Sequence, residues 1–222
     1  MVSLFQQGGV VMYVLLLMSI LAITIILLKL HQFARSSLRE TAIVEKTISA
    51  LQRGQHEKAL QVLAGHPSPV AAVLESAIRF GADPKMSTSD VEAEVSRVGS
   101  ARIRDLESWL RGLSSIAHLS PLLGLLGTVT GMIAAFMNLE AAGSKVDPSI
   151  LSGGIWEALL TTAFGLTVAI PAMAAFYYLE GEVDRVRAAM KDASIRVLRH
   201  FGKTPHIDDR DDPRLEDETH GL

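Results

Sequence analysis

Three long stretches with almost no charged side chains limit the folds open to this chain more than any other feature. Residues 1–28 and 112–139 contain no Lys, Arg, Asp or Glu, and residues 148–179 contain only Glu157. Each stretch exceeds the roughly 20 residues that a transmembrane helix needs. The first lacks the basic start and the small-residue cleavage site of a signal peptide, so we expect it to be retained. The sequence therefore predicts an all-α membrane protein with three transmembrane helices.

The basic residues that flank these stretches predict the orientation of the chain. They follow the first stretch, precede the second and follow the third, whereas the N-terminus has none and the segment 140–147 has only Lys145. By the positive-inside rule, the N-terminus is expected to lie outside the cell membrane and the C-terminus in the cytoplasm. The predicted segments are a periplasmic N-terminus (1–9), transmembrane helix 1 (10–29), a cytoplasmic helical region (30–111), transmembrane helix 2 (112–138), a periplasmic loop (139–152), transmembrane helix 3 (153–179), a cytoplasmic helix (180–202) and an acidic tail (203–222).

The cytoplasmic segments are expected to extend the membrane helices. Apolar residues recur at helical spacing through residues 41–80, interrupted by Gly and Pro, which predicts short helices joined by turns. Ser89 and Glu92 match a capping box, and the apolar face that follows predicts one helix from about residue 89 to 138. The third transmembrane helix is expected to continue to about residue 200. The tail holds seven acidic and three basic residues and is predicted to be disordered.

Composition argues against several classes of function. A net charge of −3 without a basic patch gives no reason to expect a nucleic-acid partner, and the absence of Cys removes disulfides and Cys-zinc sites. His118 stands alone without ligand spacing, so we expect an interfacial or core histidine, with a proton relay as the alternative. No nucleophile, base and orienting group recur together, and no inverted repeat suggests a small-solute transporter. We therefore expect neither an enzyme nor a bound metal or cofactor.

Glu157 and nearby threonines form the candidate site. A charged side chain at the centre of a membrane helix costs roughly 2.5–3.5 kcal/mol on the mildest scale, so such residues usually face a bundle interior or a water-filled path. Thr161 and Thr162 follow Glu157 closely, while Thr128, 17 residues beyond Arg111, matches the depth of Thr162, which lies 18 residues before Glu180. Together these side chains suggest a polar path for a small cation, most simply a proton. Alternatively, the threonines bond their own helices and Glu157 only pairs with another subunit.

Small residues on the same two helices predict close packing. Gly124, Gly127 and Gly131 recur on the second transmembrane helix, and Gly165 lies on the face of the third that begins at Glu157. Such faces let helix backbones approach closely, and packing alone is an alternative reason for their presence. The long helices also carry more apolar surface than one chain can bury, and three helices cannot enclose a pore. We therefore expect a homo-oligomer surrounded by membrane lipid, with the bulky first helix facing the lipid.

At these residues the chain resembles a known family. The stretches "GLLGTVTGM" at 124–132 and "GGIWEALLTTAFGLTVAIP" at 153–171 are similar to the two signature helices of the ExbB/TolQ/MotA proton-channel family. The three-helix layout and the large first cytoplasmic segment match the ExbB/TolQ branch. By motif position, Thr128 and Thr162 match the pore-lining threonines of the family, and Glu157 matches its intramembrane glutamate.

The resemblance implies an assembly and a function. It implies a pentameric bundle in a bacterial inner membrane, closed around the single-span helices of an ExbD/TolR-like partner with an intramembrane Asp. In that family, proton flow powers a TonB-like energy transducer that reaches toward the outer membrane. The expected function is therefore a proton-channel subunit of ExbB type. A TolQ-like role in envelope maintenance and a non-conducting membrane scaffold are the alternatives.

Overall fold

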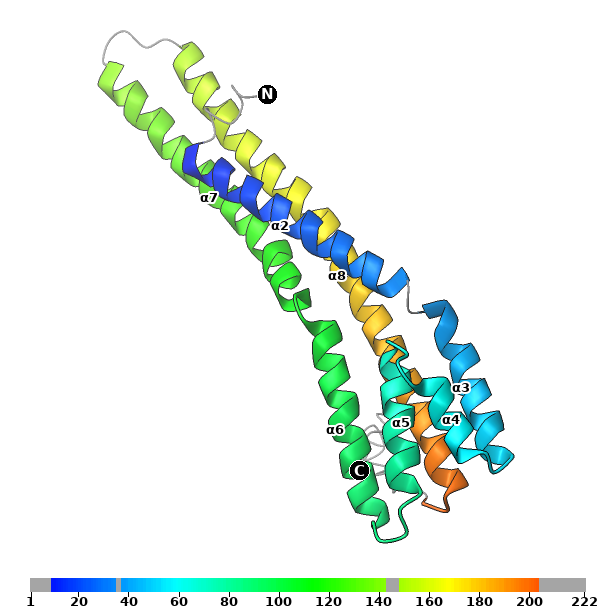
Figure 1. Cartoon of the computed structure of the whole chain (residues 1–222). Helices are drawn as coiled ribbons and strands as arrows, with labels where there is room; N and C mark the ends of the chain where they lie inside the picture. Colours follow the sequence, from blue (N-terminus) through cyan, green and yellow to red (C-terminus); the bar gives the residue numbers. More distant parts are fainter. Residues whose placement is uncertain (1–8, 35–36, 143–147, 204–222) are drawn as a thin grey trace, which may run out of the picture. The chain divides into compact units, whose positions relative to one another are not determined.

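The computed structural model describes residues 9–34, 37–142 and 148–203, and these ranges contain helices but no strand, which confirms the all-α prediction for them (Figure 1). In chain order the helices are α2 (Gly9–Ala34), α3 (Ser37–Gln52), α4 (His56–Leu63), α5 (Pro69–Gly81), α6 (Thr88–Glu107), α7 (Leu110–Ala142) and α8 (Pro148–His200). The chain divides into two compact units. The first comprises Met1–Ser37 and Arg104–Arg185, and the second comprises Leu38–Ile103 and Val186–Leu222.

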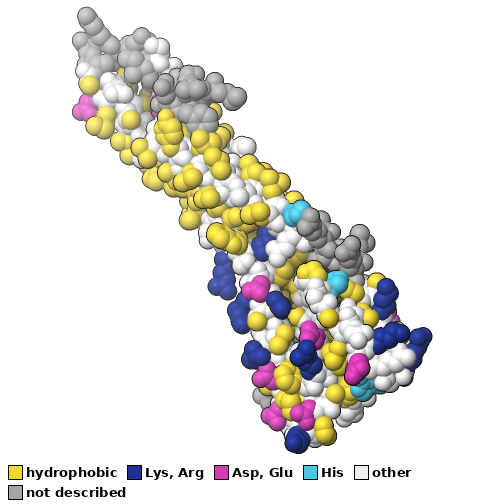
Figure 2. Space-filling view, in the orientation of Figure 1, with side chains coloured by type: hydrophobic (Ala, Val, Ile, Leu, Met, Phe, Trp, Pro, Cys, Tyr) yellow, Lys and Arg dark blue, Asp and Glu magenta, His cyan; other side chains and the backbone are white. Residues whose placement is uncertain are grey.

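The first unit is built from helices suited to a membrane. Three helical stretches of the described chain are long and apolar enough to cross a bilayer, and only 17%, 17% and 28% of the residues in their most apolar windows are buried. Large apolar side chains therefore cover the surface of this unit, as Figure 2 shows on its visible face. Such a surface is unfavourable in water and suits lipid or another subunit. The described chain thus contains three helices long and apolar enough to be the predicted transmembrane helices.

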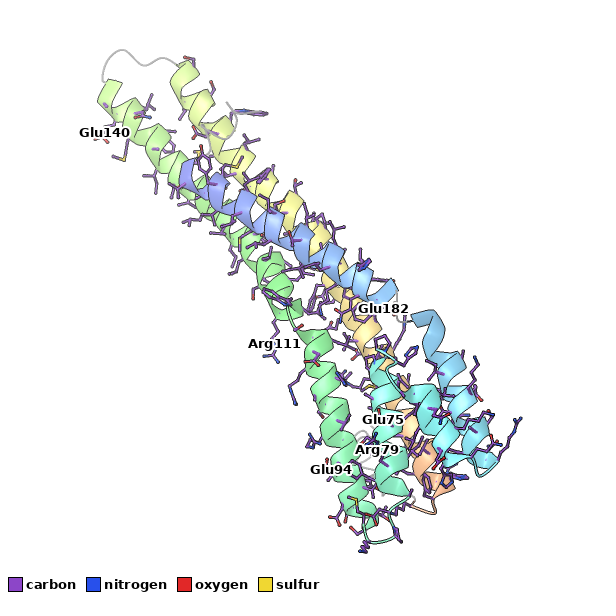
Figure 3. All side chains as sticks on the ribbon, in the orientation of Figure 1. Glu75, Arg79, Glu94, Arg111, Glu140 and Glu182 are labelled. Carbon is purple, nitrogen blue, oxygen red and sulfur yellow. The ribbon has the colours of Figure 1, made fainter. Side chains whose placement is uncertain are left out.

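Helix α7 is central to the first unit. Its neighbour α2 packs against it, and α8 approaches it closely at the glycines described below. Arg111 and Glu140 lie near its two ends (Figure 3), and no Lys, Arg, Asp or Glu lies between them. Pro121 in α7 and Pro171 in α8 lie inside their helices without ending them. The apolar part of α7 therefore runs uninterrupted between its two charged ends.

The prediction of one helix from residue 89 to 138 is wrong. Helix α6 ends at Glu107 and α7 begins at Leu110, with Ser108 and Trp109 forming a turn between them. Trp109 has a φ of 68°, in the left-handed region that a bulky L-residue adopts only at a cost in free energy. The apolar spacing on the two sides of the turn gives no sign of this break.

The second unit consists of short helices around an apolar core, as the spacing of its apolar residues predicts. Gly54 and Gly65, with φ of 71° and 72°, adopt the left-handed conformation that allows the chain to turn after α3 and α4. Ser68 caps α5, since its Oγ accepts a hydrogen bond from the Val70 amide at 3.1 Å. The largest fully buried side chains of this unit are Leu51, Leu63, Leu74, Ile78, Leu198, Val70, Val91, Val197 and Thr47.

The cap of α6 lies two residues before the predicted one. The Oγ of Ser87, rather than that of Ser89, accepts a hydrogen bond from the amide of Asp90 at 3.2 Å, and α6 begins at Thr88. Ser87 and Asp90 have the same three-residue spacing as Ser89 and Glu92. The structure places the cap at Ser87, so the prediction of a cap at Ser89 is wrong by two residues.

The end of α8 is anchored within the second unit. After His200 the chain turns at Gly202, which has a φ of 70°. The Phe201 ring lies against Gly81, where an added Cβ would stand 2.7 Å from the ring. Lys203 Nζ donates to the carbonyl oxygens of Asp83 and Phe80, at 2.8 and 3.4 Å, beside the end of α5. Helix α8 thus ends where the sequence predicts, whereas the acidic tail from residue 204 onward lies outside the described residues.

Candidate functional site

At Gly124 and Gly165 the backbones of α7 and α8 approach each other closely. A Cβ added to Gly165 would stand 2.6 Å from the carbonyl oxygen of Ser120 and 3.0 Å from the Cα of Gly124. A Cβ added to Gly124 would stand 3.1 Å from the Cα of Thr162. The nearby atoms belong to the backbone and cannot turn aside as a side chain can. Gly165 therefore leaves no room for a side chain while the helices lie this close, and a Cβ at Gly124 would require the backbones to shift by a few tenths of an ångström.

The contact continues along both helices through other small residues. Gly127 faces Thr161, whose Oγ1 would lie 2.5 Å from a Cβ added to the glycine. One turn further along α7, Gly131 faces Ala158, whose Cβ would lie 3.1 Å from an added Cβ. Gly124, Gly127, Gly131 and Gly165, singled out from the sequence, all lie in the α7–α8 contact.

Thr128 and Thr162 meet directly across this contact. Their Oγ1 atoms form a hydrogen bond in which either hydroxyl can be the donor. The Oγ1 of Thr162 also lies 2.9 Å from the carbonyl oxygen of Gly124, and that of Thr128 lies 3.1 Å from the same oxygen. Both side chains are half-buried. The two threonines, which the sequence places at the same depth in the membrane, thus contact each other in the structure.

Thr161 lies beside this pair but is enclosed. Its side chain is 2% exposed, and its Oγ1 donates to the carbonyl oxygen of Ala158 at 2.7 Å. The carbonyl oxygen of Gly124 is a second possible acceptor, at 3.3 Å. Three hydroxyls therefore surround one carbonyl oxygen, which has only two lone pairs. They cannot all donate to it at once, so the network has more than one arrangement of its protons.

Glu157 is not part of this hydroxyl cluster. It lies half-buried on α8, five residues before Thr162, a separation of about 7.5 Å along a helix. Within the described part of the chain, its carboxylate makes no hydrogen bond or ion pair. The structure of one chain thus brings Thr128, Thr161 and Thr162 together and leaves the carboxylate available to another group.

The histidine of this region bonds within its own helix. The Nδ1 of His118 lies 2.7 Å from the carbonyl oxygen of Ser114, and the side chain is exposed. Among residues 9–34, 37–142 and 148–203, no group of three or more His, Cys, Asp or Glu side chains is placed to hold a metal ion. The chemistry that this region offers is therefore that of hydroxyls and one carboxylate.

Comparison with known proteins identifies the family. The model of the MotA/TolQ/ExbB proton channel family matches residues 30–192, which include all the site residues described above. The chain belongs to this family. A putative biopolymer transport protein ExbB homolog of Methanothermobacter thermautotrophicus is 30% identical over 82% of this chain and 63% of its own length. A putative ExbB-like protein of Synechocystis is 36% identical over 79% of this chain and 68% of its own length.

Other relatives of the family match a shorter part of the chain. The biopolymer transport protein exbB1 of Vibrio cholerae is 41% identical over 46% of this chain and 45% of its own length. The Tol-Pal system protein TolQ of Haemophilus influenzae is 38% identical over 47% of this chain and 47% of its own length. The chain thus spans between 45% and 68% of the length of these four relatives. These relatives and the three apolar helices place it in the ExbB/TolQ branch, as a multi-pass membrane protein.

Sequence reasoning missed Ser120, which contributes backbone to the site. Its side chain is fully buried, with Oγ donating to the carbonyl oxygen of Ile116 at 2.7 Å, and its own carbonyl oxygen faces Gly165. Ser120 lies four residues before Gly124, so it shares the face of α7 that carries the glycines. The four-residue spacing could have identified Ser120 from the sequence, because serine is a small residue like the glycines that follow it on this face.

Proposed function

We propose that this protein is the proton-channel subunit of an ExbB–ExbD-like complex that uses the proton motive force to do work at the outer membrane. The observation that carries the proposal is the hydrogen-bonded Thr128–Thr162 pair, held in place by the contact of α7 with α8. Membership of a proton channel family supports conduction. The names of several relatives, which are biopolymer transport proteins of ExbB type, support the ExbB-like role.

The mechanism follows from the chemistry of hydroxyl groups. A pore lined mainly by Val, Leu, Gly and Ala would exclude water, and a bare proton does not cross such a region without a titratable carrier. We expect an Asp of a single-span ExbD/TolR-like partner to be that carrier. Thr128 and Thr162 each donate and accept, so they can bond the partner carboxyl in both protonation states. Glu157, without a partner in the described chain, would then tune the outer entrance of the path.

The network around Gly124 gives this mechanism a physical basis. Because three hydroxyls compete for the two lone pairs of one carbonyl oxygen, at least one of them can turn toward another acceptor. Thr162 and Thr128 are half-buried, whereas Thr161 is almost fully enclosed. We therefore expect Thr128 and Thr162 to contact the partner, and Thr161 to act on the path by setting which acceptor Thr162 uses.

The proposed assembly is a homopentamer in the bacterial inner membrane. Its N-terminus would be periplasmic and its C-terminus cytoplasmic, with α2 facing lipid and with α7 and α8 surrounding the pore. The exposed apolar side chains on all three membrane helices support contacts beyond one chain. Proton flow through the complex would drive a TonB-like energy transducer.

Two alternatives have support of their own. The similarity to TolQ of Haemophilus influenzae favours a Tol-Pal role almost as well as an ExbB role, and co-purification with a TolR-like rather than an ExbD-like partner would support it. A non-conducting scaffold is favoured by the hydrogen bonds that Thr128, Thr161 and Thr162 already make within the chain. In that case Glu157 would only pair with a partner subunit.

Conservative replacements of Thr162 test the proposal. We expect Thr162→Ser to keep most proton flux in vesicles that contain the protein and its partner, because it keeps the hydroxyl. Thr162→Val, nearly equal in volume to threonine, should lose most of the flux. Thr24→Val is the matched control, since the Thr24 hydroxyl donates to Ile20 of its own helix at 2.8 Å and its side chain is exposed. Equal flux in the Val and Ser variants, at matched assembly, would show that the hydroxyl serves packing alone.

A further inference from the structure

Lys29 is a buried charged residue that the proposed proton path does not use. It lies near the end of α2, and its side chain is 4% exposed. Its Nζ donates to the carbonyl oxygen of Leu106 at 2.8 Å and to the Oε1 of Gln32 at 3.1 Å. An ammonium group this buried is stable only where acceptors replace its lost water. The shorter of the two hydrogen bonds, to the Leu106 carbonyl oxygen, indicates the role of this lysine.

That acceptor is a carbonyl group at the end of α6, where the break before α7 removes the backbone amide that would bond it in a continuous helix. In an unbroken helix, the Leu106 carbonyl would accept from the Leu110 amide, and the Asp105 carbonyl from the Trp109 amide. Instead, Lys29 Nζ donates to Leu106, and the Ser108 hydroxyl donates to Asp105 at 2.6 Å. Each carbonyl group has therefore received a side-chain donor in place of a backbone amide.

The break needs such support because its backbone is unfavourable. Trp109 has a φ of 68°, and its side chain is 72% exposed, so burial of the ring within this chain does not offset the strained conformation. The Ser108 hydroxyl acts locally, whereas Lys29 comes from 77 residues earlier in the sequence. A positive charge at the C-terminal end of α6 is also favoured by the helix dipole.

We propose that Lys29 is a positioning residue that keeps the helix broken at Ser108–Trp109 and thereby fixes where α7 begins. Without the ammonium group, the buried Leu106 carbonyl regains a partner only if the Leu110 amide returns to it. Trp109 then adopts right-handed helical geometry, and the break closes. The consequence for function rests on the proposed proton conduction, because α7 is the helix that carries Thr128 to Thr162.

Amide hydrogen exchange of the full-length protein in lipid nanodiscs tests the structural part. In Lys29→Met, the amides of Trp109 and Leu110 should exchange about fivefold more slowly than in the wild type, as expected when each gains a helical hydrogen bond. Lys46→Met is the matched control, since Lys46 is exposed on α3, and it should leave this exchange unchanged. Unchanged or faster exchange of the two amides in Lys29→Met would overturn the proposal.

A second substitution distinguishes closure of the break from a general loss of stability in Lys29→Met. Glycine adopts a positive φ at no steric cost, so Trp109→Gly in the Lys29→Met background should reopen the break. Exchange of the Leu110 amide and proton flux in vesicles should then both return toward the wild-type values. Failure of the double variant to recover either quantity would count against Lys29 as a positioning residue. Absence of flux in the wild type would instead reject the proposed function, and the exchange result would still decide the role of Lys29.

Discussion

The Gly165→Ala variant puts the contact of α7 with α8 to a quantitative test. The added Cβ would stand 2.6 Å from the carbonyl oxygen of Ser120, about 0.8 Å inside ordinary van der Waals contact. Relief requires the two helices to separate by a similar distance, because backbone atoms on both sides form the contact. The Thr162 Oγ1 to Gly124 oxygen distance would then grow from 2.9 Å to about 3.7 Å, which is too long for a hydrogen bond.

The expected loss of stability is the difference between two effects. Overpacking of a tight contact costs about 1–3 kcal/mol, and alanine recovers about 1 kcal/mol of helix propensity relative to glycine. We therefore expect Gly165→Ala to be destabilised by up to about 2 kcal/mol, with proton flux reduced more strongly because the hydroxyl pair is pulled apart. Gly181→Ala is the matched control on the same helix, since an added Cβ there meets nothing within 4 Å.

Two measurements in parallel decide the outcome. Thermal unfolding in mild detergent, followed by circular dichroism, reports stability, and a pH-sensitive dye inside vesicles that hold the protein and its partner reports flux. Gly181→Ala should equal or slightly exceed the wild type in stability and should match it in flux. If Gly165→Ala behaved like Gly181→Ala in both measurements, the close approach of the two helices would not be what holds the hydroxyls together.

Two further predictions concern parts of the protein away from the threonine pair. Thr47 is fully buried, and its hydroxyl finds no hydrogen-bond partner among the described residues, so Thr47→Val should raise the free energy of unfolding by about 1 kcal/mol in chemical denaturation. An equal or lower value would show that the hydroxyl is satisfied. Native mass spectrometry with lipid retained should show a pentamer as the main species, and a spectrum of monomers alone would contradict the proposed assembly.

The sequence predicted the features that depend on residues close together along the chain. Uncharged length indicated the membrane helices, and glycine and proline indicated the turns of the second unit. The pairing of Thr128 with Thr162 was also within reach, because distances counted from Arg111 and Glu180 on two antiparallel helices place both residues at the same depth. Each of these inferences needed only helix geometry and the position of the nearest charged residue.

The sequence failed where a contact between distant residues decides the local structure. The apolar spacing is helical on both sides of Trp109, and the donor that takes the place of the Leu110 amide is Lys29. The different surroundings of Thr161 and Thr162 were equally hidden. The side chains of consecutive residues on a helix point about 100° apart. Only the position of α7 shows that Thr161 is enclosed and Thr162 half-buried.

The anchoring of Phe201 and Lys203 against the end of α5 has a consequence for how the protein is made. The second unit is assembled from Leu38–Ile103 and Val186–Leu222, and the 82 residues Arg104–Arg185 separate the two segments. At roughly 5–20 residues per second, a ribosome needs about 4–16 s to add those residues. During that time α3, α4 and α5 have left the ribosome without the end of α8 that completes their core. Synthesis of the last two membrane helices must therefore precede completion of this unit, and a chaperone that covers its apolar residues would act in that interval.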